Sequence, residues 1–211
     1  MVTKRVHKRQ LLLMDDDYVN QVIEYTLAYC VWKYKLDVHA LIVEGNHIHR
    51  VDTDALGFRP DFIRDFHSFV GRQLNRYYDE GDSFFSSKKT NIADNEEEHD
   101  VLQRIVYTMG NPVADGIERE GKNHKGIRMR WPQPERIIKK PKGFWRPIEK
   151  GGVTPDELPL RFVRPPGYEG LTDNELDTLL EQRTLDYEKQ AREERQETDK
   201  EFLSAVGARL E

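Results

Sequence analysis

Apolar residues recur at helical spacing in three stretches of the first half of the chain. Residues 19–30 follow three aspartates and are apolar at i, i+3, i+4, i+8 and i+11, with Thr26 at i+7 on the same face, which predicts an amphipathic helix. Aromatic residues step round one face of a second predicted helix, 58–79. A third apolar stripe begins at Val101 and is predicted to end near Asn111-Pro112, because proline disfavours helical backbone in the residue before it.

The segments between these helices are predicted to be strands. They are residues 2–14, 36–43, 47–52 and 83–90, with a turn at Glu44-Gly45-Asn46 between the second and the third. The resulting order is strand, helix, strand, strand, helix, strand, helix. This order predicts an α+β fold, in which a ferredoxin-like antiparallel sheet carries helices on one face.

The composition of the chain changes after residue 121. Residues 122–164 contain twelve Lys/Arg and four Asp/Glu, together with several prolines, Trp131 and Trp145. Cations interleaved with aromatic rings suit single-stranded nucleic acid, because cations hold phosphates and rings stack on bases. A linker wrapped over the first domain is the alternative for this basic arm, 122–168.

The last segment, 169–211, is acidic. It contains six Lys/Arg and thirteen Asp/Glu, and a Thr172-Asp173-Asn174-Glu175 capping box predicts the start of a charged helix. Apolar residues are sparse after Leu185, which indicates a solvated helix that packs weakly or is partly disordered. The sequence thus predicts a domain at 1–121 followed by the arm and this tail.

Two histidines on a predicted strand are candidate metal ligands. His47 and His49 are separated by Ile48, and residues i and i+2 of a strand point to the same face. Two imidazoles on one face supply half of a metal site. Such a pair in isolation, however, more often lies on the protein surface and binds no metal.

A tyrosine on the third predicted helix is a candidate reactive group. This helix follows an acidic stretch, 94–98, that resembles a helix start. Tyr107 and Asn111 lie off the apolar stripe and one turn apart, on a polar face that they share with Arg104. A boundary tyrosine with its hydroxyl in water is the alternative interpretation.

Together, these stretches resemble the REP-associated tyrosine transposases, within the wider group of HUH single-tyrosine transposases. The resemblance rests on Asn46-His47-Ile48-His49 and on Tyr107 followed by Asn111-Pro112-Val113-Ala114-Asp115-Gly116-Ile117. An aromatic and basic helix, 62–78, and Gly81-Asp82-Ser83-Phe84-Phe85 lie between them, as in the family. Order and spacing agree over roughly residues 2–118.

The resemblance implies an HUH endonuclease fold and an enzyme that cuts and rejoins single-stranded or hairpin DNA. Tyr107 would attack a phosphodiester, leaving a 5′-phosphotyrosine and a free 3′-hydroxyl. The same resemblance implies Mg²⁺ or Mn²⁺ as the cofactor, with His47, His49 and Asn111 as its ligands. A domesticated protein that recognises a DNA sequence or hairpin without strand transfer is the alternative function, and an adaptor that recruits a partner through its charged tail is a third.

Basic residues that suit the DNA backbone fall in three places: the first strand, the second helix and the end of the fourth strand. On the first strand, a solvated edge protected by charge is an equally good explanation. The candidate DNA-binding residues are Lys4, Arg5, Lys8, Arg9, Arg72, Arg76, Lys88 and Lys89.

The sequence departs from the family pattern at three points. Gly45 stands where the family usually has proline, Arg50-Val51-Asp52 replace an aliphatic run, and Ala114-Asp115 replace an expected arginine and its neighbour. These departures put family-type hairpin contacts in doubt. His39 matches no family ligand and is interpreted as a structural histidine.

Composition limits the remaining possibilities. Cys30 is the one cysteine, so no internal disulfide can form, which fits a reducing cytoplasm. No apolar run approaches the roughly 20 residues that a membrane span needs, so no membrane partner is expected. The net charge of −5 argues mildly against indiscriminate nucleic-acid binding. The sequence leaves open a monomer or a homodimer.

Overall fold

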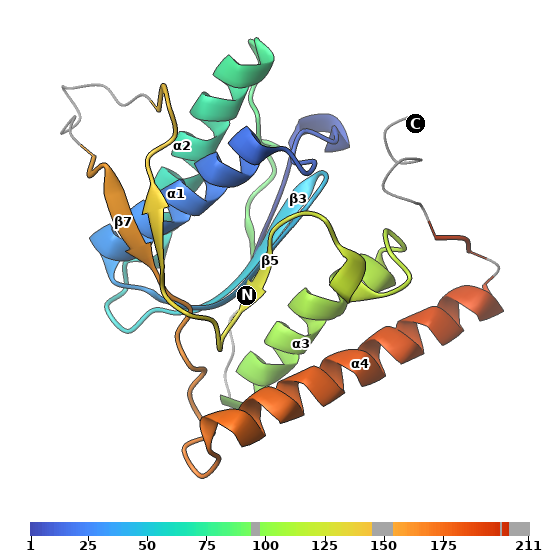
Figure 1. Cartoon of the computed structure of the whole chain (residues 1–211). Coiled ribbons are helices and arrows are strands. Elements are labelled where there is room, and N and C mark those ends of the chain that lie inside the picture. Colours follow the sequence, from blue (N-terminus) through green and yellow to red (C-terminus); the bar gives the residue numbers. More distant parts are fainter. Residues whose placement is uncertain (94–97, 145–153, 199, 203–211) are drawn as a thin grey trace.

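The computed structural model describes residues 1–93, 98–144, 154–198 and 200–202 (Figure 1). The main-sheet strands are β1 (Val2–Arg5), β2 (Asp37–Glu44), β3 (His47–Thr53), β4 (Asn91–Ile92) and β5 (Arg128–Arg130). The α-helices of this part of the chain are α1 (Asp17–Tyr34), α2 (Arg59–Tyr78), α3 (Glu98–Ala114) and α4 (Asp173–Glu197). The strands are antiparallel in the order β4-β1-β3-β2-β5, so the predicted α+β class is confirmed.

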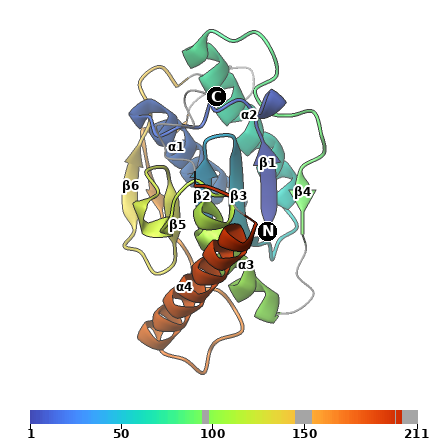
Figure 2. The ribbon, with the colours of Figure 1, turned by 90° about the vertical axis from the view of Figure 1, so that its right-hand side faces the viewer.

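The helices cover both faces of the sheet, not one as the sequence predicted. α1 and α2 pack together on one face, whereas α3 lies across β2 and β3 on the other, with α4 outside it (Figures 1 and 2). The burial of the central strands explains this arrangement. Every residue of β2 after Asp37, and every residue of β3 before Thr53, is buried, and strands that are buried on both faces need a layer on each.

The β2–β3 hairpin turns on only two residues, Gly45 and Asn46, so Glu44 belongs to β2 rather than to the turn. A Cβ at Gly45 would lie 2.9 Å from Sδ of Met14, which explains why a glycine fits this position. The register places Glu44 opposite His47 and Ile42 opposite His49. Cross-strand partners of this kind share one face of the sheet, so the tight turn adds a carboxylate to the histidine pair.

The first strand is shorter than predicted, and the predicted fourth strand, 83–90, is wrong apart from one isolated bridge at Phe85, because β4 begins only at Asn91. β1 ends at Arg5, and a 3₁₀ turn, His7–Arg9, follows, in which Lys8 and Arg9 have φ values of 50° and 59°. The first and fourth predicted strands are joined by only one isolated bridge, between Val6 and Phe85. Regular pairing with β1 occurs at β4, after the predicted fourth strand. The reason is burial: Val6 and Phe85 pack in the core, whereas the basic residues beyond them turn out to solvent.

The ends of α1 and α3 follow from specific caps. The Asp16 carboxylate accepts hydrogen bonds from the backbone N–H groups of Tyr18 and Val19, which starts α1. α3 passes through Pro112, contrary to the prediction, and ends at Ala114, with Gly116 in the cap that follows at a φ of 76°. The N–H of Ile117 donates to the Pro112 carbonyl at 2.8 Å, and the N–H of Gly116 donates to Val113, which is a Schellman cap. Of the acidic start predicted at 94–98, residues 94–97 lie outside the described part.

The basic segment after residue 121 is integrated into the fold. β5 extends the sheet beside β2, and a hairpin of β6 (Arg136–Lys139) and β7 (Glu157–Leu160) packs on α1. Trp131 is 8% exposed, beneath the guanidinium of Arg164, and so does not present its ring to a nucleic acid. Trp145 lies outside the described residues.

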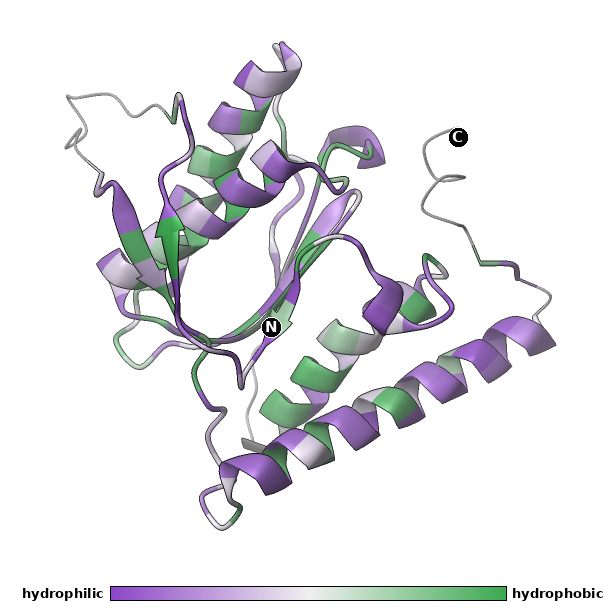
Figure 3. Ribbon diagram, in the orientation of Figure 1, coloured by the Kyte–Doolittle hydropathy of each residue, from purple (hydrophilic) through white to green (hydrophobic). Residues whose placement is uncertain are grey.

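α4 begins at the predicted capping box and packs along α3. Its outer surface is hydrophilic, and apolar residues are concentrated on α3 (Figure 3). Gly110 allows the close approach of the two helices, because a Cβ there would lie 2.4 Å from Cδ1 of Tyr187. The buried residues of α4 are Leu176, Leu180, Thr184, Glu188 and Ala191. Few apolar residues suffice on this face because Gly110 lets the two helices approach closely.

Candidate metal centre and basic cleft

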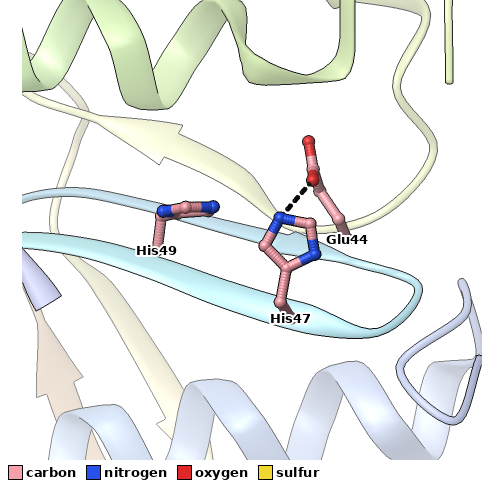
Figure 4. Close-up of side chains that lie close together, drawn as sticks. All are labelled: Glu44, His47 and His49. Atoms are coloured by element: carbon pink, nitrogen blue, oxygen red, sulfur yellow. Dashed lines mark ion pairs between the residues drawn. The ribbon is translucent and has the colours of Figure 1, made fainter. Parts of the chain in front are cut away.

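Three buried side chains of the β2–β3 hairpin form a group that can hold a metal ion. Glu44, His47 and His49 each offer one ligand atom, and these atoms all lie within 4.8 Å of one another. Figure 4 shows the three side chains projecting from the hairpin toward the same space. The two imidazole centroids are 4.7 Å apart. The strand alternation that predicted the histidine pair therefore also brings in Glu44 from the neighbouring strand.

The hydrogen bonds of His47 favour a cation beside it. Nδ1 of His47 lies 2.7 Å from Oδ1 of Asn46, whose Nδ2 donates to the Arg9 carbonyl at 3.4 Å. An amide oxygen only accepts, so Nδ1 of His47 carries a proton and donates it. Nε2 lies 2.8 Å from Oε2 of Glu44, a contact that needs a proton or a cation between the two atoms. A divalent cation between Nε2 and the carboxylate would replace that proton.

His49 is held as a neutral imidazole. Burial, followed by the charge of His47, lowers the pKa of His49 to about 4. Its Nδ1 lies 2.9 Å from the hydroxyl of Thr3, and a hydroxyl can accept the Nδ1 proton. Nε2 then keeps its lone pair, and it is buried without a hydrogen-bond partner among the described residues. A fixed tautomer with a free lone pair is what a metal-binding histidine requires.

Asn111, on α3, completes the group from the opposite side. Its Nδ2 donates to Oε2 of Glu44 at 3.0 Å. Oδ1 of Asn111 and Oε1 of Glu44 are both buried, and within the described chain neither accepts a hydrogen bond. With Nε2 of His49 these make three orphaned lone-pair atoms, and a buried atom of this kind normally has a partner. A divalent cation held by Glu44, His47 and His49 would give the atoms of Glu44 and His49 a partner, so the residues present fit a metal ion.

Glu44 and Asp115 are site residues that the sequence reasoning missed. Oδ2 of Asp115 lies 3.4 Å from Nε2 of His47, and this side chain is 43% exposed at the rim of the group. Burial, and then the charge of Glu44, raise the pKa of Asp115. For Glu44, burial acts to raise the pKa, but the hydrogen bond and charge of His47 outweigh it and hold the pKa low. Counting a two-residue turn in the sequence would have placed Glu44 opposite His47.

Tyr107 lies beside the metal group. Its ring centroid is 5.9 Å from that of His49 and 6.0 Å from that of Tyr187 on α4. Burial raises the pKa of Tyr107 above its usual 10.0, and the carboxylates of Asp115 and Glu44 raise it further. α3 therefore places both Tyr107 and Asn111 beside the histidine pair, with the two residues on one helix face as the sequence predicted.

A cleft of about 570 Å³ opens beside Tyr107 and His49 along the edge of β1. It gathers six of the eight predicted DNA-binding residues, although they come from two distant segments of the sequence. They are Lys4, Arg5, Lys8, Arg9, Lys88 and Lys89. Lys4 bridges the two segments, because its Nζ donates to the Lys88 carbonyl at 3.0 Å. The cleft is thus positively charged along its length and leads to Tyr107.

The other two predicted DNA-binding residues lie elsewhere. Arg72 and Arg76 belong to α2, on the face of the sheet opposite α3. The guanidinium of Arg72 stacks on Phe69 at 5.1 Å. Neither arginine lines the cleft, so the structure separates them from Tyr107 and the histidines.

Within the described residues, no helix combines the length and apolar character that crossing a bilayer requires. Comparison with protein-family models, with curated proteins and with solved structures finds no match for this chain.

Proposed function

We propose that this protein is a single-stranded DNA endonuclease and strand transferase of the tyrosine transposase type. The observation that carries the proposal is the basic cleft, because it brings Tyr107 and His49 together with six cationic side chains. The strand order β4-β1-β3-β2 also suits the ferredoxin-like sheet of HUH endonucleases, which is the fold that the sequence resemblance implies.

In this proposal, the reaction begins with attack by Tyr107 and ends with Tyr107 covalently bound to the DNA. Its phenolic oxygen forms a bond to the phosphorus while the bond from phosphorus to the 3′-oxygen breaks. The phenolic proton is transferred to the departing 3′-oxygen, and the product is a 5′-phosphotyrosine with a free 3′-hydroxyl. The ester retains the energy of the broken bond, so the reverse reaction rejoins strands without a nucleotide cofactor.

The protein's own residues orient the substrate. The cations of the cleft hold the phosphates on each side of the scissile bond, and the half-buried ring of Tyr107 fixes the direction of attack. His47, His49, Glu44 and Asn111 would hold the metal. When bound, a divalent cation neutralises the phosphate oxygens and so reduces the repulsion of an attacking phenolate.

The donor set favours Mn²⁺ over Mg²⁺ as that cation. Mg²⁺ prefers oxygen ligands in octahedral geometry and keeps several of its waters. Two imidazole nitrogens beside one carboxylate suit transition-metal ions better than Mg²⁺, and of the two candidate cations only Mn²⁺ belongs to that series. We therefore expect Mn²⁺ to support strand cleavage at lower concentration than Mg²⁺.

One observation favours the second candidate, a DNA-binding protein without strand transfer. The pKa of Tyr107 is raised by burial and by two carboxylates, whereas a nucleophile benefits from a lowered pKa. A bound divalent cation would reverse the local charge balance, so the two candidates differ in whether metal binding activates Tyr107.

The deciding experiment tests for a covalent adduct. Wild-type protein is incubated with single-stranded DNA hairpins and Mn²⁺ or Mg²⁺, and a denaturing gel reveals protein that remains attached to DNA. We expect an adduct with wild type and none with Tyr107→Phe, which removes one oxygen and should change stability by about 1 kcal/mol or less. Tyr77→Phe, on the exposed surface of α2, is the control and should form the adduct normally.

The position of the label distinguishes the candidates. An adduct that maps to the peptide containing Tyr107 supports the enzyme. Hairpin binding without any adduct, with either metal, supports the binding protein instead. An adduct that persists in Tyr107→Phe would assign the nucleophile to another residue.

A further inference from the structure

A second hollow, of about 340 Å³, lies between α3 and α4, which run side by side (Figure 1). Its floor is formed by Leu102 and Val106, which are buried. The rings of Tyr107 and Tyr187 form one wall. The volume is sufficient for a single planar ring system and falls at the lower end of the range for small-molecule pockets.

Tyr107 lines both this hollow and the basic cleft. Its ring stands between His49 on one side and Tyr187 on the other, with centroid distances of 5.9 and 6.0 Å. A strand whose phosphates follow the cleft to Tyr107 therefore comes next to the rim of the hollow.

The rim of the hollow is cationic, although α4 is an acidic helix. Arg104 and Arg183 line it, and none of the acidic residues that the structure describes does. Within the described residues, neither arginine forms a hydrogen bond or an ion pair. Another hollow beneath α4, lined by Arg128 and Glu188 among others, contains internal ion pairs. The rim arginines are thus available to an anionic ligand.

We propose that this hollow binds one unpaired base of the DNA strand, adjacent to the phosphate that Tyr107 attacks. The proposal rests on the proposed function and extends it to a base-binding site. Tyr187 stacks on the base, the apolar floor receives its edge, and Arg183 holds the flanking phosphate. Such stacking tolerates any base, because every base has an aromatic face. The site would therefore favour unpaired over duplex DNA at the position of attack.

The test compares two probes with equal phosphates. Equilibrium binding is measured for oligothymidine and for an abasic strand of the same length, in low salt and without metal. Stacking of one base is worth about 5-fold to 100-fold in affinity, so wild type should bind oligothymidine more tightly. Tyr187→Leu, which keeps an apolar side chain against Gly110, should reduce that preference by about 5-fold or more and leave binding to the abasic strand unchanged.

Two charge variants on α4 complete the design and do not disturb its packing. Arg183→Gln should weaken the binding of oligothymidine, whereas Lys189→Gln, which removes the same charge from an exposed position outside the hollow, should not. A preference that survives in Tyr187→Leu, or equal effects of the two charge variants, overturns the base site and leaves the cleft in place. Failure of wild type to bind either strand overturns both the base site and the proposed function.

Discussion

The β2–β3 hairpin carries a buried polar cluster on each face of the sheet, and the two clusters balance their charges differently. On the face of α1 and α2, Asp52 is 5% exposed, and each of its oxygens has a cationic partner. Oδ2 accepts from Arg50 and Oδ1 from Arg59, both at 2.7 Å. The Arg50 guanidinium stacks on Phe62 at 4.0 Å, and its unpartnered atom, Nη2, is a donor.

In the cluster on the face of α3, the unpartnered buried atoms are acceptors. They belong to Glu44, His49 and Asn111, and all can donate a lone pair to a cation. Buried polar atoms usually have partners, and a donor cannot bind a metal. The comparison teaches that burial of charge alone does not identify a site: the identity of the unpartnered atoms distinguishes a structural ion pair from a ligand group.

The largest expected effect tests this distinction through stability. Asp52→Asn leaves the buried Arg50 without a full counter-charge and should lower the free energy of unfolding by about 3–5 kcal/mol. Glu44→Gln should cost less, about 1 kcal/mol, because its partner His47 can lose a proton whereas an arginine cannot. Chemical denaturation measures both. Equal losses of unfolding free energy in the two variants would contradict the proposed difference in charge balance between the two faces.

The second expected effect tests the ligand group directly. Mn²⁺ at 100 times its dissociation constant should stabilise wild type by about 2.7 kcal/mol, and His49→Ala should abolish this stabilisation. His39→Ala is the matched control, because both nitrogens of His39 already have partners, the Val163 carbonyl and the Thr53 hydroxyl, at 2.9 and 2.8 Å. This control should lower stability but retain the response to Mn²⁺, as measured by thermal unfolding. Stabilisation that persists in His49→Ala would place the metal elsewhere.

Period-two alternation and helical spacing were sufficient to predict part of the site. They placed His47 and His49 on one face of a strand and Tyr107 with Asn111 on one face of a helix, and the structure brings both pairs together. Local spacing could not place Glu44, because that required the turn length as well as the strand. The difference between a three-residue and a two-residue turn decides whether this carboxylate leaves the sheet or joins the histidines.

The layers of the fold depend on contacts that spacing does not encode. α3 could pack on either face of the sheet as far as its apolar stripe is concerned, and the burial of both faces of β2 decides between them. The tail was expected to pack weakly because apolar residues are few after Leu185. Gly110 and its contact with Tyr187 overcome that shortage through close approach, which only the paired helices reveal.

The third expected effect concerns pH and belongs to the face of α1 and α2. Burial, with the charges of Arg50 and Lys4, lowers the pKa of His67 from 6.5 to about 3. Between these values the unfolded chain binds more protons than the native protein, so stability falls as the pH drops below 6.5. We expect His67→Phe to reduce this acid sensitivity by about 1 kcal/mol per pH unit near pH 5. Denaturation curves at pH 7 and pH 5 provide the measurement, and an unchanged difference would contradict the assignment.

The smallest expected effect compares cations on the two faces. Lys89 lines the basic cleft, whereas Arg76 lies on α2, away from it, and both side chains are exposed. Each phosphate contact contributes about 0.7 to the slope of log affinity against log salt for a single strand. Lys89→Gln should therefore lower the magnitude of that slope by roughly this amount for oligothymidine.

Arg76→Gln removes the same charge and should leave the slope unchanged, because no phosphate following the cleft reaches α2. The control also separates local contacts from the general charge of the protein, which both variants alter equally. Equal slopes for the two variants would mean that DNA does not follow the cleft, and a smaller slope for Arg76→Gln alone would move the binding surface to the face of α1 and α2. Either result would remove the electrostatic support for attack by Tyr107, since the phosphates would then not follow the cleft that leads to it.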